Sequence, residues 1–217
     1  MQQKTETLQK VIFEALRDRI IYGAYAPGSA LSEKEICEEF RTSRTPFREA
    51  VLKLQDMKLV TVIPRYGTSV APVDINDIRC AFELKVKLEG MACELAAQRI
   101  TDEQLQSLAQ AIEASVRLCG RLQEEDFFRL LEMEADFHDI IRQASGNHVL
   151  KEYLENLHLR CARLWSLNIG RSIPGSEIID QMKAIHHALH LRDPLAARNL
   201  MENHVLYFID KMKMQLL

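Results

Sequence analysis

Two arginines one helical turn apart, Arg44 and Arg48, are well placed in this sequence to bind a charged partner. Both fall off the apolar stripe of their segment, which runs through Phe47, Val51 and Leu54. A guanidinium pairs with a guanine edge through two parallel hydrogen bonds and also binds phosphate oxygens. This spacing predicts a nucleic-acid contact, and the alternative interpretation is a pair of solvated surface arginines with nearby Glu49 as partner.

The elements that must position these arginines are three short helices. Ser32 and Glu35 form a capping box that marks the start of the second helix, and Ser43 is expected to cap the third. Pro46 lies in the first turn of the third helix, where its missing N–H costs no hydrogen bond. The predicted helices cover residues 6–21, 33–40 and the segment from Ser43 towards Lys58, with turn residues over 23–31 and a tight turn at Arg41-Thr42.

Two β-rich runs, at residues 59–63 and 68–71, follow the helices around a four-residue turn. Helices joined by a tight turn and followed by a hairpin are typical of a winged helix-turn-helix, whose second helix enters the major groove. At the hairpin tip, Arg65 supplies a cation and Gly67 allows close approach of the backbone to DNA. Lys34, on the preceding helix, is expected to reach a phosphate.

After Asp74 the strand pattern does not return, and every segment has helical periodicity. We expect a mainly α protein, with a winged helix-turn-helix DNA-binding domain over residues 1–73 and an antiparallel six-helix bundle over residues 74–217. The predicted helices of the bundle lie near residues 75–99, 102–121, 125–144, 147–169, 177–191 and 194–214.

The composition is that of a globular protein, since 47% of the 217 residues are hydrophobic and 27% are charged. Five widely spaced cysteines indicate neither a disulfide framework nor a thiolate zinc site. No apolar run is long enough to span a membrane, and the first ten residues lack an apolar signal core, so we expect a cytoplasmic protein.

The charges are unevenly distributed along the chain. Residues 1–73 carry 11 Lys and Arg against 9 Asp and Glu, a net charge of +2, whereas residues 74–217 carry 17 against 22, a net charge of -5. A net charge of +2 is a weak indicator of DNA binding, because the position of the cations decides it.

Three motifs carry a resemblance to a known family. They are Gly23-x-x-x-Pro27-Gly28-x-x-Leu31-Ser32-Glu33, Ser43-Arg44-Thr45-Pro46-Phe47-Arg48-Glu49-Ala50-Val51-x-x-Leu54 and Gly67-x-x-Val70. Together they resemble the DNA-binding domain of GntR-family transcription regulators. The helical remainder resembles the FadR-C-terminal (FCD) effector domain in its six-helix, VanR-like form. The resemblance implies a repressor that binds a palindromic operator in double-stranded DNA as a homodimer and responds to a small organic acid, with no membrane partner.

The resemblance also assigns DNA contacts by position. Many relatives carry an arginine where this chain has Lys34, which preserves a phosphate contact but not a bidentate base contact. The residues implied by position are Lys34, Ser43, Arg44, Thr45, Arg48 and Gly67, to which the hairpin adds Arg65.

A divalent metal site is implied in the helical domain. Glu134 and His138 lie one turn apart, and similar domains often bind a metal through such a pair and a histidine on each of the last two helices. His204 matches the final histidine, but Met182 stands where histidine is usual, and a thioether is a poor ligand for zinc, nickel or manganese. His186 is an alternative ligand, displaced by about 6 Å along the helix. Without a metal, His138 and His204 are interior histidines of the bundle.

The same region is the expected effector site. Lys85 stands where relatives commonly carry a pocket arginine, although a solvated lysine is the alternative interpretation. The residues expected to bind the effector are Lys85, Glu134, His138, Arg160, Met182 and His204.

Two other function classes remain as alternatives. One is a metal-dependent enzyme built on Glu134, His138 and His204, but the sequence has no nucleophile elbow, H-E-x-x-H motif, phosphate-binding glycine loop or dinucleotide fingerprint. The other is an adaptor whose winged helix binds protein. Loss of DNA affinity with rising salt distinguishes a DNA-binding protein from an adaptor.

Overall fold

The computed structural model describes residues 2–119, 127–164 and 174–216, and its contacts divide the chain into two units. Of the described residues, the first unit holds those up to Ile78 together with Leu159 to Leu164, and the second unit holds the others. The first unit thus extends beyond the segment 1–73 that the sequence indicated. A short piece from later in the chain joins it.

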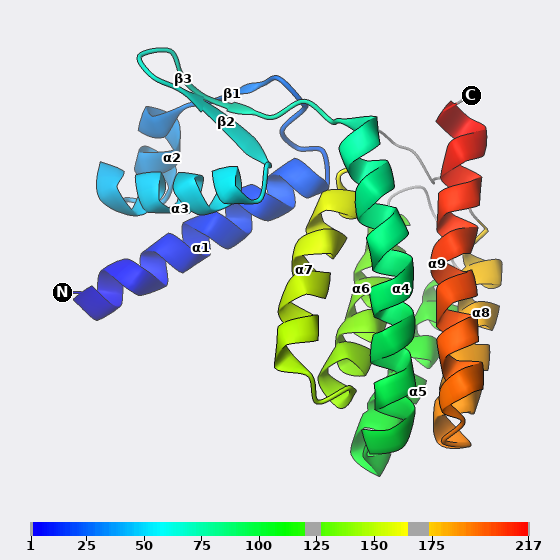
Figure 1. Cartoon of the computed structure of the whole chain (residues 1–217). Helices are drawn as coiled ribbons and strands as arrows, with labels where there is room; N and C mark the ends of the chain where they lie inside the picture. The colour runs from blue at the N-terminus through cyan, green and yellow to red at the C-terminus, as the bar shows by residue number, and fades with distance from the viewer. Residues whose placement is uncertain (1, 120–126, 165–173, 217) are drawn as a thin grey trace. The chain divides into compact units, whose positions relative to one another are not determined.

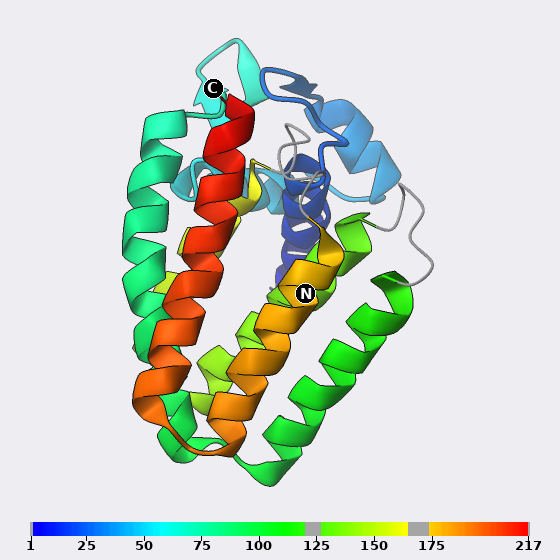
Figure 2. The same ribbon diagram turned by 90° about the vertical axis from the view of Figure 1, so that its right-hand side faces the viewer.

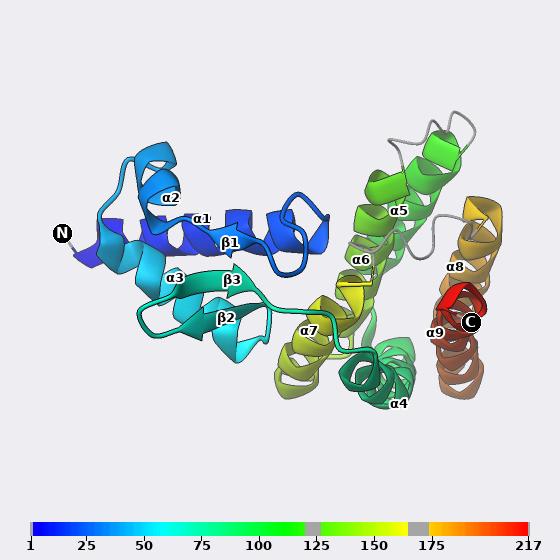
Figure 3. The same ribbon diagram turned by 90° about the horizontal axis from the view of Figure 1, so that it is seen from above.

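Three N-terminal helices and a small sheet make up most of the first unit (Figure 1). The long α1 lies beside α3, the recognition helix of the predicted motif, and Leu16 and Leu54 are fully buried in their shared core (Figures 1 and 3). The predicted apolar stripe of the third helix is therefore confirmed. The helices are α1 (Gln2–Ile21), α2 (Glu33–Glu39) and α3 (Arg44–Asp56).

The sheet contains the predicted hairpin and one strand that the sequence did not indicate. Its strands are β1 (Ala30–Leu31), β2 (Val60–Ile63) and β3 (Gly67–Val70), all antiparallel in the order β1-β3-β2. β1 falls within the segment expected to be turn. Two residues are too few to show an alternating pattern, so the strand is defined only by its pairing with β3.

Two residues of the hairpin turn, Arg65 and Gly67, have a positive φ, and the tip of the turn is exposed to solvent. Arg65 has a left-handed φ of 68°, which is uncommon for a residue with a Cβ atom, and Gly67 has a φ of 111°. Tyr66, between them, is 90% exposed. The hairpin therefore presents a cation and an aromatic ring on its outer edge.

The two predicted helix caps differ in outcome. The Ser32 hydroxyl accepts a hydrogen bond from the Glu35 backbone N–H at 3.3 Å, as the capping box predicts. Ser43 is the N-cap residue of α3, as predicted, but its side chain makes no capping hydrogen bond. The usual donor to an N-cap oxygen is the third helical residue, which here is Pro46 and has no N–H.

The second unit is built on the six predicted helices. Figure 2 shows α5, α8, α9 and α4 side by side in that order. The expected helix ends at residues 120–121, 125–126 and 165–169 lie outside the described residues. The bounds are α4 (Ile75–Arg99), α5 (Asp102–Cys119), α6 (Phe127–Ala144), α7 (His148–Ala162), α8 (Gly175–His190) and α9 (Pro194–Leu216).

Gly90 allows α4 and α9 to approach closely. A Cβ atom at this position would lie 2.6 Å from the Glu202 side chain, which is too close for any larger residue without rearrangement. Glu202 also pairs with Lys87 of α4 at 2.6 Å. None of the helices in the described part of the chain has the length and apolar character of a membrane span.

Candidate functional site

The seven residues expected to contact DNA are all exposed on the first unit. They come from the start of α2, the start of α3 and the hairpin tip, which are the elements that a winged helix-turn-helix presents to DNA. The set is Lys34, Ser43, Arg44, Thr45, Arg48, Arg65 and Gly67.

Arg44 and Arg48 share one acidic partner, Glu33 of α2. The Arg44 Nε lies 3.1 Å from one Glu33 oxygen and the Arg48 Nε lies 3.0 Å from the other. The two arginine side chains are 77% and 64% exposed, and the hydrogen bond that Arg48 donates to Glu33 raises the pKa of Arg48. The ion pair of each arginine therefore crosses from α3 to α2 and does not involve Glu49, its neighbour on α3.

A shallow cleft of about 430 Å³ opens beside this pair of arginines. Lys34 and Ser43 line it together with Glu33, Cys37 and Arg44. Lys34 is highly exposed and lies 4.0 Å from Glu38. The cleft brings the start of α2 and the start of α3 to one surface.

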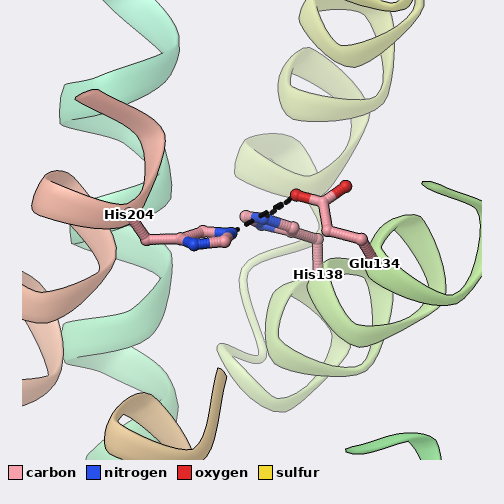
Figure 4. A group of neighbouring side chains, drawn as sticks. All are labelled: Glu134, His138 and His204. Atoms are coloured by element: carbon pink, nitrogen blue, oxygen red, sulfur yellow. Dashed lines mark hydrogen bonds and ion pairs between the residues drawn. The ribbon is translucent and has the colours of Figure 1, made fainter. Parts of the chain in front are cut away.

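Inside the second unit, Glu134, His138 and His204 converge (Figure 4). The first two come from α6 and the third from α9, and all three are buried. The His138 Nε2 lies 2.9 Å from the Glu134 Oε1, and the His204 Nε2 lies 3.4 Å from the same oxygen. The structure therefore brings together the three residues that the resemblance implies as metal ligands.

The geometry of this cluster fits a divalent metal. Ligand atoms held by one ion at about 2.1 Å lie roughly 3.0–3.4 Å from one another. One candidate ligand atom from each of Glu134, His138 and His204 lies within 4.8 Å of the others. Neither ring nitrogen of the buried His138 has a well-aligned hydrogen bond, so neither is committed to a partner that a metal would have to displace.

A second buried carboxylate, Glu89 of α4, extends the cluster. It accepts hydrogen bonds from the Arg142 guanidinium, its Oε2 lies 3.3 Å from the His138 Nδ1, and its Oε1 lies 3.9 Å from the Lys85 Nζ. Glu89, Lys85 and Arg142 are at most 6% exposed. Glu134, His138 and Arg142 occupy i, i+4 and i+8 of one helix, a polar line that could have revealed Arg142 in the sequence.

The charges of this network set its pKa values. Burial alone would raise the pKa of Glu89, but the positive charges of His138 and Arg142 hold it well below its ordinary value. Burial likewise opposes the charged form of His138, and the two carboxylates beside it raise its pKa. Burial lowers the pKa of His204. The carboxylates are therefore ionised at neutral pH.

The remaining predicted residues have other surroundings. Met182 is fully buried in α8, where its neighbour Gln181 places an oxygen 2.8 Å from the His204 Nδ1. The Nε2 of His186 lies 3.1 Å from the Leu105 carbonyl oxygen, so the structure does not bring this nitrogen to the cluster.

Arg160, also expected at the effector site, belongs to the first unit, where it lies 3.7 Å from Asp77. Arg163, in the same unit, donates hydrogen bonds to the backbone carbonyls of Lys58, Ala71 and Pro72. Both arginines thus support the base of the hairpin and the start of α4.

Comparison with known proteins gives two family matches. The family described as bacterial regulatory proteins, gntR family, matches residues 8–70, and the FCD domain matches residues 80–206. The chain is 29% identical over 201 residues to the HTH-type transcriptional repressor RspR of Escherichia coli strain K12, covering 93% of this chain and 87% of that protein. It is 28% identical over 200 residues to the HTH-type transcriptional repressor GlaR of the same strain, covering 88% of this chain and 89% of that protein.

Solved structures share the fold. Escherichia coli McbR/YncC has a TM-score of 0.85 at 23% identity, covering 97% of this chain and 99% of that chain. A GntR regulator from Rhodococcus sp. RHA1 has a TM-score of 0.75 at 21% identity, covering 96% and 97%.

Replacement of Arg142 by methionine should strongly destabilise the second unit. The change removes a buried cation and leaves Glu89 poorly compensated, which costs about 3–5 kcal/mol in comparable buried pairs. Urea denaturation, followed by circular dichroism, would measure the loss.

Arg117→Met is the matched control, because Arg117 pairs with Glu113 at 3.5 Å on the exposed face of α5. That change should cost less than about 0.5 kcal/mol. Equal losses in the two variants would contradict the role assigned to Arg142.

Proposed function

The chain belongs to the GntR family of bacterial regulatory proteins and carries its FCD domain, and we propose that it is a repressor whose binding to a palindromic operator is modulated by a small carboxylate. It is a DNA-binding transcription regulator by family. The observation that carries the finer proposal is that the chain has two separate sites. One unit has an exposed face with two arginines, and the other has a buried cluster that contains cations.

The names of two relatives support repression in preference to activation. RspR and GlaR are both named transcriptional repressors and match most of this chain. We expect the same sign of regulation here. An enzyme or a protein-binding adaptor is less well supported, because the relatives with named functions are transcription regulators.

Arg44→Ala should weaken binding to the operator by about 1–3 kcal/mol, because Arg44 projects from the first turn of α3 and is suited to a guanine edge. The probe is a duplex selected from a randomised library with the wild-type protein, and fluorescence anisotropy gives the affinity. Lys53→Ala is the control, since Lys53 lies nine residues further along α3, about 14 Å along its axis. An unchanged affinity in folded Arg44→Ala would contradict the assignment.

We expect a homodimer. One winged helix contacts only a few base pairs, whereas two copies related by a two-fold axis match a palindrome. Sedimentation equilibrium at micromolar concentration tests this expectation. Species of 25 kDa alone would contradict it.

Lys85 is proposed to bind the carboxylate of the effector. It is 6% exposed, and its ammonium lies at the long distance of 3.9 Å from the Glu89 carboxylate. Lys85→Met should therefore reduce the rise in melting temperature that small mono- and dicarboxylic acids produce. Lys87→Met is the control, because Lys87 lies on the same helix with its side chain 65% exposed. An equal response in Lys85→Met and wild type would contradict the proposal.

Glu134, His138 and His204 are proposed to hold zinc, nickel or manganese weakly, since three ligands leave an incomplete protein shell. A bound divalent ion would supply a positive charge to an acidic effector. Met182→His should raise metal affinity substantially, by restoring the fourth ligand position of the family. Isothermal titration with Zn²⁺ measures the change.

Two further variants complete this metal experiment. Met182→Leu adds no ligand and should bind as wild type does, whereas His138→Ala should abolish binding. Tight binding of one ion per chain by the wild type would contradict the weak site that Met182 implies.

A further inference from the structure

Glu33 is an acidic residue on the face that carries the predicted DNA contacts. It lies in the first turn of α2, and its carboxylate bridges the Nε atoms of Arg44 and Arg48 on α3. The side chain is 30% exposed, compared with 77% and 64% for the two arginines. The carboxylate therefore sits behind the two guanidinium groups.

The bridge leaves the two arginines with different free donors. Arg44 approaches Glu33 most closely through its Nε, as an ion pair, and no hydrogen bond of its Nη groups is found in the described part of the chain. Arg48 uses its Nε and also one Nη, at 3.4 Å from the other carboxylate oxygen. Two Nη groups side by side match the O6 and N7 atoms of guanine, so Arg44 keeps the donor pair that recognises a base.

Stability of the fold does not account for this arrangement. Exposed ion pairs typically contribute little to folding, because water solvates both charges. A carboxylate on a DNA-binding face also repels phosphate, which weakens contacts to any DNA sequence. An acid here opposes indiscriminate binding while it orients the arginines.

We propose that Glu33 determines the sequence specificity of DNA binding, by holding Arg44 with its Nη groups towards the bases and by disfavouring contacts of both arginines with phosphate. Glu33 is thus a positioning residue that acts through the arginines. The inference rests on the proposed DNA contacts of Arg44 and Arg48.

The test compares Glu33→Gln with wild type on two duplexes. One is the duplex selected with the wild type from a randomised library, and the other is a scrambled duplex of the same length and composition. Glutamine has the same shape but one acceptor oxygen and no charge, so it cannot bridge both arginines. The ratio of the two affinities should fall at least about fivefold, with binding to the scrambled duplex about two- to fivefold tighter.

Glu38→Gln is the matched control. Glu38 lies on the same helix, is 68% exposed and forms an ion pair with Lys34. The change removes the same charge, so its affinity ratio should stay near the wild-type value. Equal ratios for Glu33→Gln and Glu38→Gln would overturn the proposal, and thermal unfolding confirms that both variants are folded.

A double-mutant cycle separates this inference from the proposed function. Arg44→Ala alone tests whether Arg44 contacts the operator, and in that background Glu33→Gln should have little further effect on the ratio. If Arg44→Ala weakens operator binding but Glu33→Gln leaves the ratio unchanged, the inference fails and the proposed function stands. If the effect of Glu33→Gln persists in full without Arg44, Glu33 does not act through this arginine and the proposal is again overturned.

Discussion

The buried carboxylate of Glu89 is the interaction on which the interior of the second unit depends. A carboxylate without water is costly unless cations and hydrogen bonds surround it, and here Arg142, His138 and Lys85 do so. Because His138 is held by Glu89 at its Nδ1, its Nε2 faces Glu134, whose Oε1 in turn lies near His204. One ionised group on α4 thus orders side chains of α6 and α9, as supporting residues behind metal ligands commonly do.

The ion pairs on the surface of the first unit are exposed to water and therefore behave differently from the buried network of the second unit. The pairs that Glu33 makes with Arg44 and Arg48 are solvated, so each can be exchanged for a DNA partner at small cost. The buried pair of Glu89 and Arg142 has no such alternative partner in solvent. A rigid network suits a binding site inside a bundle, and an exchangeable one suits recognition at a surface.

Sequence patterns predicted the features that depend on residues close together in the chain. They failed for features that depend on residues far apart in the chain. The capping box at Ser32 and the apolar stripe of α3 depend on residues within one or two turns, and both are confirmed. β1 depends on its partner strand, and Ser43 makes no capping hydrogen bond because the donor is missing at Pro46. The resemblance to relatives supplied His204, which lies far along the chain from the other two ligand candidates.

The residues that the sequence missed are those defined by contacts between helices. Glu89 lies one turn after Lys85, but only the fold shows that Arg142 of another helix compensates its charge. Glu33 belongs to a quoted motif, yet its role as a bridge requires α2 and α3 to be placed together. Periodicity identifies which face of a helix is buried, and it does not identify the partner on the opposite helix.

The departure at Met182 changes how α8 contributes to the interior. Its neighbour Gln181 offers an oxygen to the His204 Nδ1 at 2.8 Å, so α8 contacts this histidine even though Met182 is a poor ligand. A neutral histidine ring donates at one nitrogen and accepts at the other, so Gln181 at Nδ1 and Glu134 at Nε2, 3.4 Å away, together fix the orientation of His204. In this chain α8 therefore orients a candidate ligand through Gln181 in place of supplying one.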